Sequence, residues 1–113
     1  MSDKRQHPRY PASGTAELQS AEGTARTWGH IADLSIGGVY LMTTHPWQPG
    51  TKLDFKLCMN EMEIHGKGEV VTAHLGVGMG VRITEMSGAD KMIFRALLKE
   101  LHIEQAAKLE SEQ

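Results

Sequence analysis

The sequence contains few cysteines, few aromatic residues and no long apolar run. Cys58 is the only cysteine among 113 residues, which excludes an internal disulfide and a cysteine-rich zinc site. The longest apolar runs, such as residues 39–42, are far too short to cross a bilayer, and residues 1–11 lack the apolar core of a signal peptide. We therefore expect a cytoplasmic protein with no membrane insertion.

An excess of basic charge is also absent. The formal net charge is -2, so the surface as a whole does not attract nucleic acid or an anionic membrane. Aromatic residues make up 5% of the chain and form no cluster on which bases would stack. We expect Trp28 in the core and Trp47 in loop packing. A small barrel that binds single-stranded nucleic acid is an alternative that this balance argues against, and we expect no nucleic-acid partner.

Side chains for catalysis or metal binding do not fall into a recognisable pattern. The six histidines are scattered and lack the close or i, i+4 spacing of a metal site. The sequence contains no readable Ser–His–Asp, Cys–His or paired-carboxylate arrangement. We therefore expect a protein that is not an enzyme and has no cofactor or metal, with Cys58 as a buried or inert thiol.

Alternating apolar and polar residues, interrupted by glycine-bearing turns, dominate the chain from Gly14 to Ile83. This period of two predicts consecutive antiparallel strands. Gly66 and Gly68 permit strong curvature within one strand, which favours a barrel. The sequence thus predicts a mainly β fold, a six-stranded antiparallel barrel. The expected strands lie within residues 15–20, 25–32, 39–42, 53–59, 62–70 and 77–83.

The apolar period changes to that of a helix near the C-terminus. A stripe at i, i+3 and i+4 spacing predicts a helix that covers the barrel, and the segment from Ser87 to Asp90 resembles a capping box at its start. The stripe consists of Ile93, Phe94, Leu97, Leu98 and Leu101.

The chain divides into three predicted parts. Residues 1–13 carry basic residues and prolines with almost no apolar spacing, which predicts a flexible, irregular arm. Residues 14–103 form the barrel and its helix. Residues 104–113 form a polar tail that either extends the helix or frays.

Two short patterns carry the functional information. Arg5 and Arg9 form an R-x-x-x-R in the arm, and Asp33, Ser35 and Gly38 form a D-x-S-x-x-G between two predicted strands. At ordinary residue usage the second pattern arises by chance in roughly 3% of chains of this length. The pair, in this order and followed by barrel strands and a helix, resembles the PilZ domain family over nearly the whole chain.

This resemblance implies a six-stranded PilZ-type barrel with a C-terminal helix that acts as a receptor for the second messenger cyclic di-GMP. It implies that Arg5 and Arg9 fold over the nucleotide against the surface of residues 33–38, and that binding orders the arm and signals to an unidentified downstream protein. In the family, the residue before the first arginine, here Lys4, influences whether one ligand or an intercalated pair binds.

The chemistry of these residues suits such a ligand. Guanidinium groups such as those of Arg5 and Arg9 bind phosphate and the O6/N7 edge of guanine. The Asp33 carboxylate can accept from the N1–H and amine of guanine, and Ser35 adds a hydroxyl. We expect Gly38 to allow close approach of the ligand and the positive φ of a tight turn, which Gly37 would loosen further.

Two simpler interpretations remain open for the same residues. The two arginines are also compatible with a solvated basic tail, and residues 33–38 with a turn in which Asp33 and Ser35 cap backbone groups. A further alternative is a PilZ-like adaptor that binds no ligand and acts through protein contacts in motility or pilus assembly.

Overall fold

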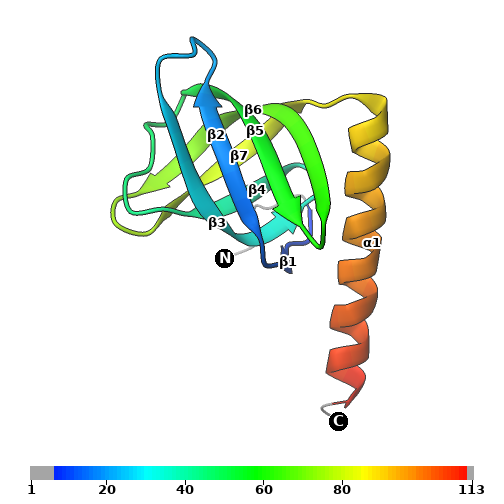
Figure 1. The fold of residues 1–113 in the computed structure, drawn as a ribbon. Coiled ribbons are helices and arrows are strands. Elements are labelled where there is room, and N and C mark those ends of the chain that lie inside the picture. The colour runs from blue at the N-terminus through cyan, green and yellow to red at the C-terminus, as the bar shows by residue number, and fades with distance from the viewer. Residues whose placement is uncertain (1–6, 112–113) are drawn as a thin grey trace.

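The computed structural model of the protein describes residues 7–111 (Figure 1). Seven strands precede one long helix. The strands are β1 (Tyr10–Pro11), β2 (Thr15–Ser20), β3 (Arg26–Ser35), β4 (Gly38–Met42), β5 (Lys52–Met59), β6 (Met62–His74) and β7 (Gly78–Glu85), and the helix is α1 (Gly88–Ser111).

Six of the strands close into an antiparallel barrel. The hydrogen-bonded order is β3-β2-β5-β6-β7-β4, and an additional pairing of β4 with β3 completes the ring. The two-residue strand β1 pairs with β3 outside this ring. The predicted six-stranded antiparallel barrel with a C-terminal helix is therefore confirmed.

Alternation along the strands directs one set of side chains into the barrel. In β5, for example, Leu53, Phe55, Leu57 and Met59 are buried, as the period of two predicts. Asn60 and Glu61 reverse the chain into β6 with φ angles of 47° and 66°, the left-handed conformation of a tight hairpin turn. The remaining core residues of the strands are Ala16, Leu18, Ile31, Leu34, Val39, Leu41, Ile64, Val70, Met79 and Val81.

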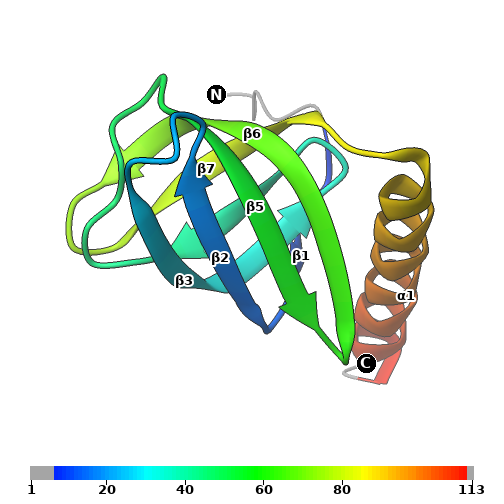
Figure 2. The ribbon, with the colours of Figure 1, turned by 45° about the horizontal axis from the view of Figure 1, so that its top comes forward.

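The long strand β6 bends and so belongs to two walls of the barrel (Figures 1 and 2). Its first half pairs with β5, and residues from Lys67 onward pair with β7 with register shifts at Lys67/Gly68 and Val70/Thr72. We call the outer surface of β2, β5 and the first half of β6 the charged wall. We call the outer surface of β4, β7, the end of β3 and the second half of β6 the glycine wall.

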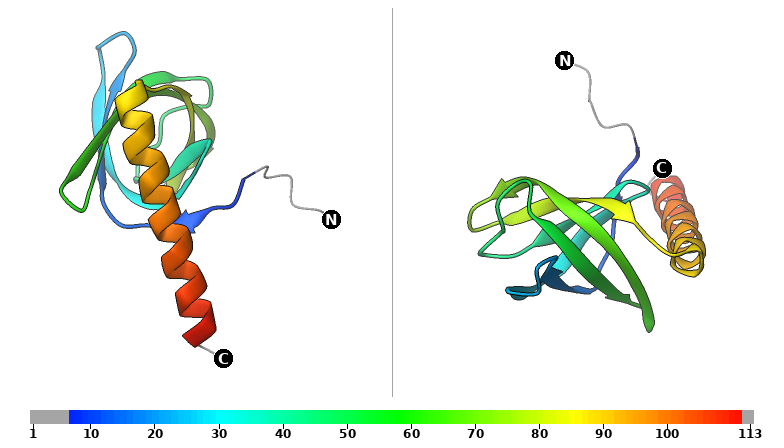
Figure 3. Two further views of the ribbon diagram at one scale, coloured as in Figure 1. Left: turned by 90° about the vertical axis from the view of Figure 1, so that its right-hand side faces the viewer. Right: turned by 90° about the horizontal axis from the view of Figure 1, so that it is seen from above.

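Helix α1 packs along one side of the barrel and extends past it (Figure 3). Phe94, Leu97 and Leu98 are buried against the barrel, together with Met86 just before the helix. Burial of these apolar side chains is what holds the helix in place, because a single helix gains most of its stability from packing. The helix continues to Ser111, and residues 102–111 are all exposed.

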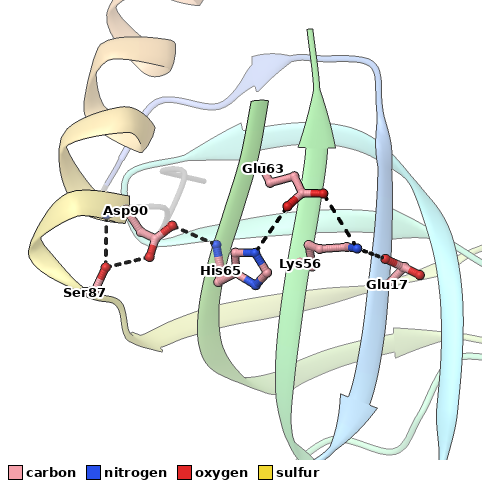
Figure 4. Close-up of polar contacts among 6 residues, drawn as sticks. All are labelled: Glu17, Lys56, Glu63, His65, Ser87 and Asp90. Atoms are coloured by element: carbon pink, nitrogen blue, oxygen red, sulfur yellow. Dashed lines mark hydrogen bonds and ion pairs between the residues drawn. The ribbon is translucent and has the colours of Figure 1, made fainter. Parts of the chain in front are cut away.

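A polar contact fixes the start of the helix to β6 (Figure 4). The Asp90 backbone N–H donates to Ser87 Oγ at 3.1 Å, and the Ser87 hydroxyl donates to Asp90 Oδ2 at 2.5 Å. Asp90 Oδ1 also accepts from the backbone N–H of His65 at 3.1 Å. The predicted cap at Ser87 is confirmed, and Asp90 extends it by joining the helix to the barrel.

Two side chains differ from their predicted positions. Trp28 was expected in the core but is 60% exposed, because the alternation in β3 directs Gly29 and Ile31 inward and Trp28 and His30 outward. Its ring packs edge-on against that of His30, with centroids 5.2 Å apart. Ile93 belongs to the predicted helical stripe but is 37% exposed, since Phe94 occupies the position that faces the barrel.

The arm also differs from expectation near its end. Tyr10 and Pro11 pair with Leu34 and Asp33 of β3, and the Ala12 N–H donates to the Ala32 carbonyl at 3.1 Å. Tyr10 and Ala12 pack against the core. The irregular segment predicted up to Ser13 therefore contains a short strand from Tyr10, because β3 is longer than β2 and its free edge accepts another partner.

Candidate ligand-binding site

A pocket of about 580 Å³ lies over the glycine wall. Strands β3, β4, β6 and β7 contribute to it, and two residues of the arm form one rim. The pocket combines backbone-rich glycine positions with two arginines and one carboxylate. Its lining residues are His7, Arg9, Asp33, Ser35, Gly37, Gly38, Val39, Tyr40, Val71, Thr72, Gly80, Val81, Arg82 and Ile83.

Five of the seven predicted site residues line this one pocket. They come from both sequence patterns, which are more than twenty residues apart in the chain and meet only in the folded barrel. Lys4 and Arg5 lie outside the described residues. The five are Arg9, Asp33, Ser35, Gly37 and Gly38.

The short strand β1 explains how Arg9 reaches the pocket. Tyr10 pairs with Leu34 and Pro11 with Asp33, so the chain runs antiparallel to the end of β3 just after Arg9. The residue before a strand pair stays close to that pair because consecutive Cα atoms are about 3.8 Å apart. Backbone pairing therefore places Arg9 beside the strand that carries Asp33 and Ser35.

Gly38 is required for a different reason from the one the sequence suggested. Its φ is not in the left-handed region, but a β carbon at this position would lie 2.5 Å from the Val81 carbonyl oxygen of β7. Gly38 therefore lets β4 approach β7 closely, in register with Arg82. Gly37 also lacks a positive φ, and among residues 7–111 its β carbon would meet only the His7 ring, at 3.4 Å.

Sequence reasoning missed several residues that the barrel brings to the pocket. Tyr40 lies between Asp33 and Gly80 in the strand register, and Arg82 lies opposite Gly38. The alternation of β4 and β7 identifies both as outward-facing, but only the pairing of these two strands shows that they share a surface with Asp33. The other missed residues are His7, Val39, Val71, Thr72, Gly80, Val81 and Ile83.

Arg82 is held at the pocket by an ion pair. Its Nη2 lies 3.1 Å from Glu69 Oε1, and the two residues are directly paired in the β6–β7 register. A carboxylate that fixes one side of a guanidinium leaves its other N–H groups available, since arginine has five donors. Arg82 therefore adds a second oriented cation to the pocket that Arg9 enters.

The charged wall presents a different arrangement (Figure 4). Lys56 Nζ lies 2.5 Å from Glu17 Oε2 and 3.8 Å from Glu63 Oε1, and His65 Nε2 lies 3.6 Å from Glu63 Oε2. The hydrogen bond to Lys56, followed by its positive charge, lowers the pKa of Glu17, and the same contact with Glu17 raises the pKa of Lys56. We call the ion pairs of Glu17, Lys56, Glu63 and His65 the ladder. A hollow of about 770 Å³ over β2 is lined by Glu17, Lys56 and His65 of this ladder and also by Arg26 and Asp54.

The sequence pattern of the PilZ domain matches residues 3–100. The chain belongs to the PilZ domain family. No curated protein sequence matches the chain. The family assignment confirms the resemblance that the two short patterns indicated.

Solved PilZ structures share the fold. The PilZ domain with c-di-GMP of YcgR from Escherichia coli superposes with a TM-score of 0.75 at 16% identity, over 96% of this chain and 98% of that one. The K. pneumonia MrkH–c-di-GMP complex gives 0.79 at 19% identity, over 96% of this chain and 57% of that one. The Bacillus subtilis inhibitor of motility MotI/DgrA gives 0.75 at 19%, over 95% and 54%. This chain thus spans little more than half the length of the last two proteins.

Two kinds of feature are absent from the described part of the chain. Within residues 7–111 no helix is both long and apolar enough to cross a membrane. In the same residues no three His, Cys, Asp or Glu side chains gather as they would around a metal ion.

Proposed function

We propose that this PilZ domain is a non-catalytic cyclic di-GMP receptor of the bacterial cytoplasm, and that the pocket on the glycine wall is its ligand site. The observation that carries the proposal is the meeting of Arg9 with Asp33, Ser35 and Gly38 around one pocket. These residues belong to two separate sequence patterns, and a solvated basic tail would give no reason for such a meeting.

The ligand's charge supports this choice. Cyclic di-GMP carries two phosphodiester charges and two guanines, and arginine binds both kinds of group through planar, paired N–H donors. Arg9 and Arg82 supply such donors at the pocket, and the Asp33 carboxylate is an acceptor for the Watson–Crick edge of guanine. The pocket thus contains complementary groups for an anionic purine ligand.

The signal, on this proposal, is the ordering of the arm. Arg5 and Arg9, with Lys4 just before them, would close over the nucleotide, and the changed surface would be read by a downstream protein. A ligand that binds one arrangement of a segment more tightly shifts the population toward that arrangement. The pairing of β1 with β3 supports this step, because it anchors the end of the arm beside the pocket.

Isothermal titration of the protein with cyclic di-GMP tests the proposal. We expect saturable binding at low-micromolar affinity or tighter. Arg9→Ala should weaken it by about 30-fold or more, because the loss of one charged hydrogen-bonding partner costs about 2–5 kcal/mol. Arg9→Lys should not restore it, since an ammonium lacks the planar fork and the stacking face of a guanidinium.

Arg26→Ala is the matched control, because Arg26 is an exposed arginine on β3 outside this pocket. It should bind like the wild type. Absence of heat with the wild type at high ligand concentration contradicts the receptor proposal and favours the adaptor that acts through protein contacts alone. Equal loss in the Arg9 and Arg26 variants would show that general charge, and not this pocket, attracts the nucleotide.

A further inference from the structure

The ring of Tyr40 lies flat across strand β7 on the glycine wall. A β carbon on Gly78 would lie 2.9 Å from Tyr40 Cε2, and one on Gly80 would lie 3.8 Å from Tyr40 Cδ1. These two ring carbons are diagonally opposite each other, so the face of the ring, and not its edge, covers the strand. The absence of side chains at both glycines makes room for this orientation.

His74 holds the far end of the ring. Tyr40 Oη lies 3.0 Å from His74 Nδ1, which is a hydrogen-bonding distance, and the two ring centroids are 6.0 Å apart. His74 pairs with Gly78 in the β6–β7 register, so the tyrosine bridges from β4 over β7 to β6. A ring that is fixed at both ends loses little conformational entropy when a ligand packs on it.

The open face of this ring belongs to the candidate ligand pocket. Tyr40 is half-buried and lines the pocket beside Thr72 and Arg82. Its direct cross-strand neighbour is Asp33, and such neighbours have β carbons about 4.5–5.5 Å apart. A planar base that meets the Asp33 carboxylate with its polar edge would therefore extend over the tyrosine ring.

We propose that Tyr40 is the stacking platform for one guanine of the ligand. This inference rests on the proposed receptor function. Aromatic rings bind bases through their π faces, and a ring backed by glycines on one side offers the other side to the base. On this proposal, the Asp33 carboxylate accepts hydrogen bonds from the polar edge of the guanine, while the Tyr40 ring stacks on its face.

Trp28 provides a comparison within the same molecule. It is also an exposed aromatic residue with a histidine neighbour, His30, but it lies on the part of β3 that pairs with β2 and does not line the pocket. Its ring meets the histidine edge-on, at an interplanar angle of 78°. Trp28→Leu is therefore a matched control for the loss of an exposed aromatic ring.

The test is titration of cyclic di-GMP into the wild type, Tyr40→Leu, Tyr40→Phe and Trp28→Leu, with thermal unfolding of each variant. We expect Tyr40→Leu to weaken binding by at least ~10-fold, the effect of losing one stacked base. Tyr40→Phe retains the ring and loses only one exposed hydrogen bond, so its affinity should stay within about fivefold of the wild type. Trp28→Leu should bind like the wild type.

Proton NMR of the bound ligand gives a readout of stacking that does not depend on affinity. A guanine stacked on a ring has its H8 signal shifted upfield, and this shift should disappear in Tyr40→Leu at saturating ligand. Unchanged affinity of Tyr40→Leu, equal weakening by Leu and Phe, or an unshifted H8 signal in the wild type would each overturn the role of Tyr40 while leaving the receptor function intact. A wild type that binds no cyclic di-GMP would overturn both.

Discussion

The charged wall and the glycine wall are two outer surfaces of one barrel that differ in the size of their side chains. On the charged wall, long side chains stand opposite one another and pair across strands, as in Glu17, Lys56 and Glu63. On the glycine wall, Gly38, Gly78 and Gly80 remove side chains, and the backbones approach closely. The first surface pairs several of its charges with one another, whereas the second presents a hollow with arginines and a carboxylate around it.

The difference indicates that the two walls of one small sheet respond differently to substitution. Exposed ion pairs are screened by water and contribute little individually, so the charged wall is tolerant of change. The glycine wall contains backbone contacts that leave no room for a β carbon, and its polar groups face the pocket. Substitutions on the two walls should therefore have different effects on ligand affinity and on folding.

The largest difference should appear in a matched pair of aspartates, one on each wall. Asp33→Ala should lower the affinity for cyclic di-GMP by roughly 2–5 kcal/mol, because it removes the carboxylate that we propose as the acceptor for the guanine edge. Asp54→Ala on the charged wall removes an exposed carboxylate 3.9 Å from Lys67 and should leave the affinity unchanged. Isothermal titration of both variants measures this, and equal affinities would contradict the assignment of the pocket.

The neighbouring glycines of the β3–β4 turn test the close contact between strands. Gly38→Ala should lower the free energy of unfolding by about 1–3 kcal/mol, because the new β carbon would lie 2.5 Å from a backbone oxygen that cannot rotate away. The β carbon of Gly37→Ala would meet, among the described residues, only the His7 ring at 3.4 Å. This substitution should change the free energy of unfolding by less than about 0.5 kcal/mol. Urea unfolding compares the two. A stable Gly38→Ala protein would show that β4 and β7 can separate at no cost.

The cap at the start of α1 should have an intermediate effect that depends on pH. The hydrogen bond from the Ser87 hydroxyl, and then that from the His65 backbone N–H, lower the pKa of Asp90. Its contribution is therefore complete above the unfolded pKa of about 3.9 and is lost as the pH falls through the lower pKa of the folded state. Asp90→Ala should cost about 1 kcal/mol at neutral pH.

Urea unfolding of the wild type and Asp90→Ala between pH 7 and pH 2.5 measures this dependence. The difference between the two proteins should be constant near neutrality and should shrink only in the acid range. A difference that grows as the pH falls would contradict the inferred role of Asp90.

The smallest effect is expected from the ladder of the charged wall. Glu17→Gln should lower the free energy of unfolding only slightly, because both charges are exposed and their attraction is screened. The loss should diminish further in high salt. Thermal unfolding at two salt concentrations checks this prediction. A larger loss of stability that salt does not reduce would contradict the interpretation of these contacts as screened, exposed ion pairs.

Much of the barrel follows from short-range pattern. Alternation locates the strands, the polar turn at Asn60 and Glu61 joins β5 to β6, and the apolar stripe with its cap locates the helix. The prediction for Trp28 is wrong because its hydrophobicity suggested the core, while the alternation of β3, with Gly29 and Ile31 facing inward, turns it outward. Composition alone does not give that phase.

Long-range pairing limits what sequence reveals of the pocket. The patterns located Arg9, Asp33 and Ser35, but Tyr40 and Arg82 belong to the same surface only because β4 pairs with both β3 and β7. The sequence did not predict strand β1, because two residues are too few to show a period and because their pairing with β3 is long-range. Which strands adjoin in a closed barrel is a property of the whole chain and not of any local segment.

Tyr10 joins the end of the arm to helix α1 through a side-chain contact. It follows Arg9 directly, and its hydroxyl lies 3.0 Å from His102 Nδ1 on α1. Residues 102–111 are exposed, so the helix projects beyond Leu98, its last buried residue. At about 1.5 Å per residue Ser111 lies roughly 20 Å from Leu98, and a tilt of ~10° there would move the tip by ~3 Å. If ligand binding orders the arm as proposed, a displacement of the arm by less than the width of an atom would be enlarged at the helix end to the scale of a side chain.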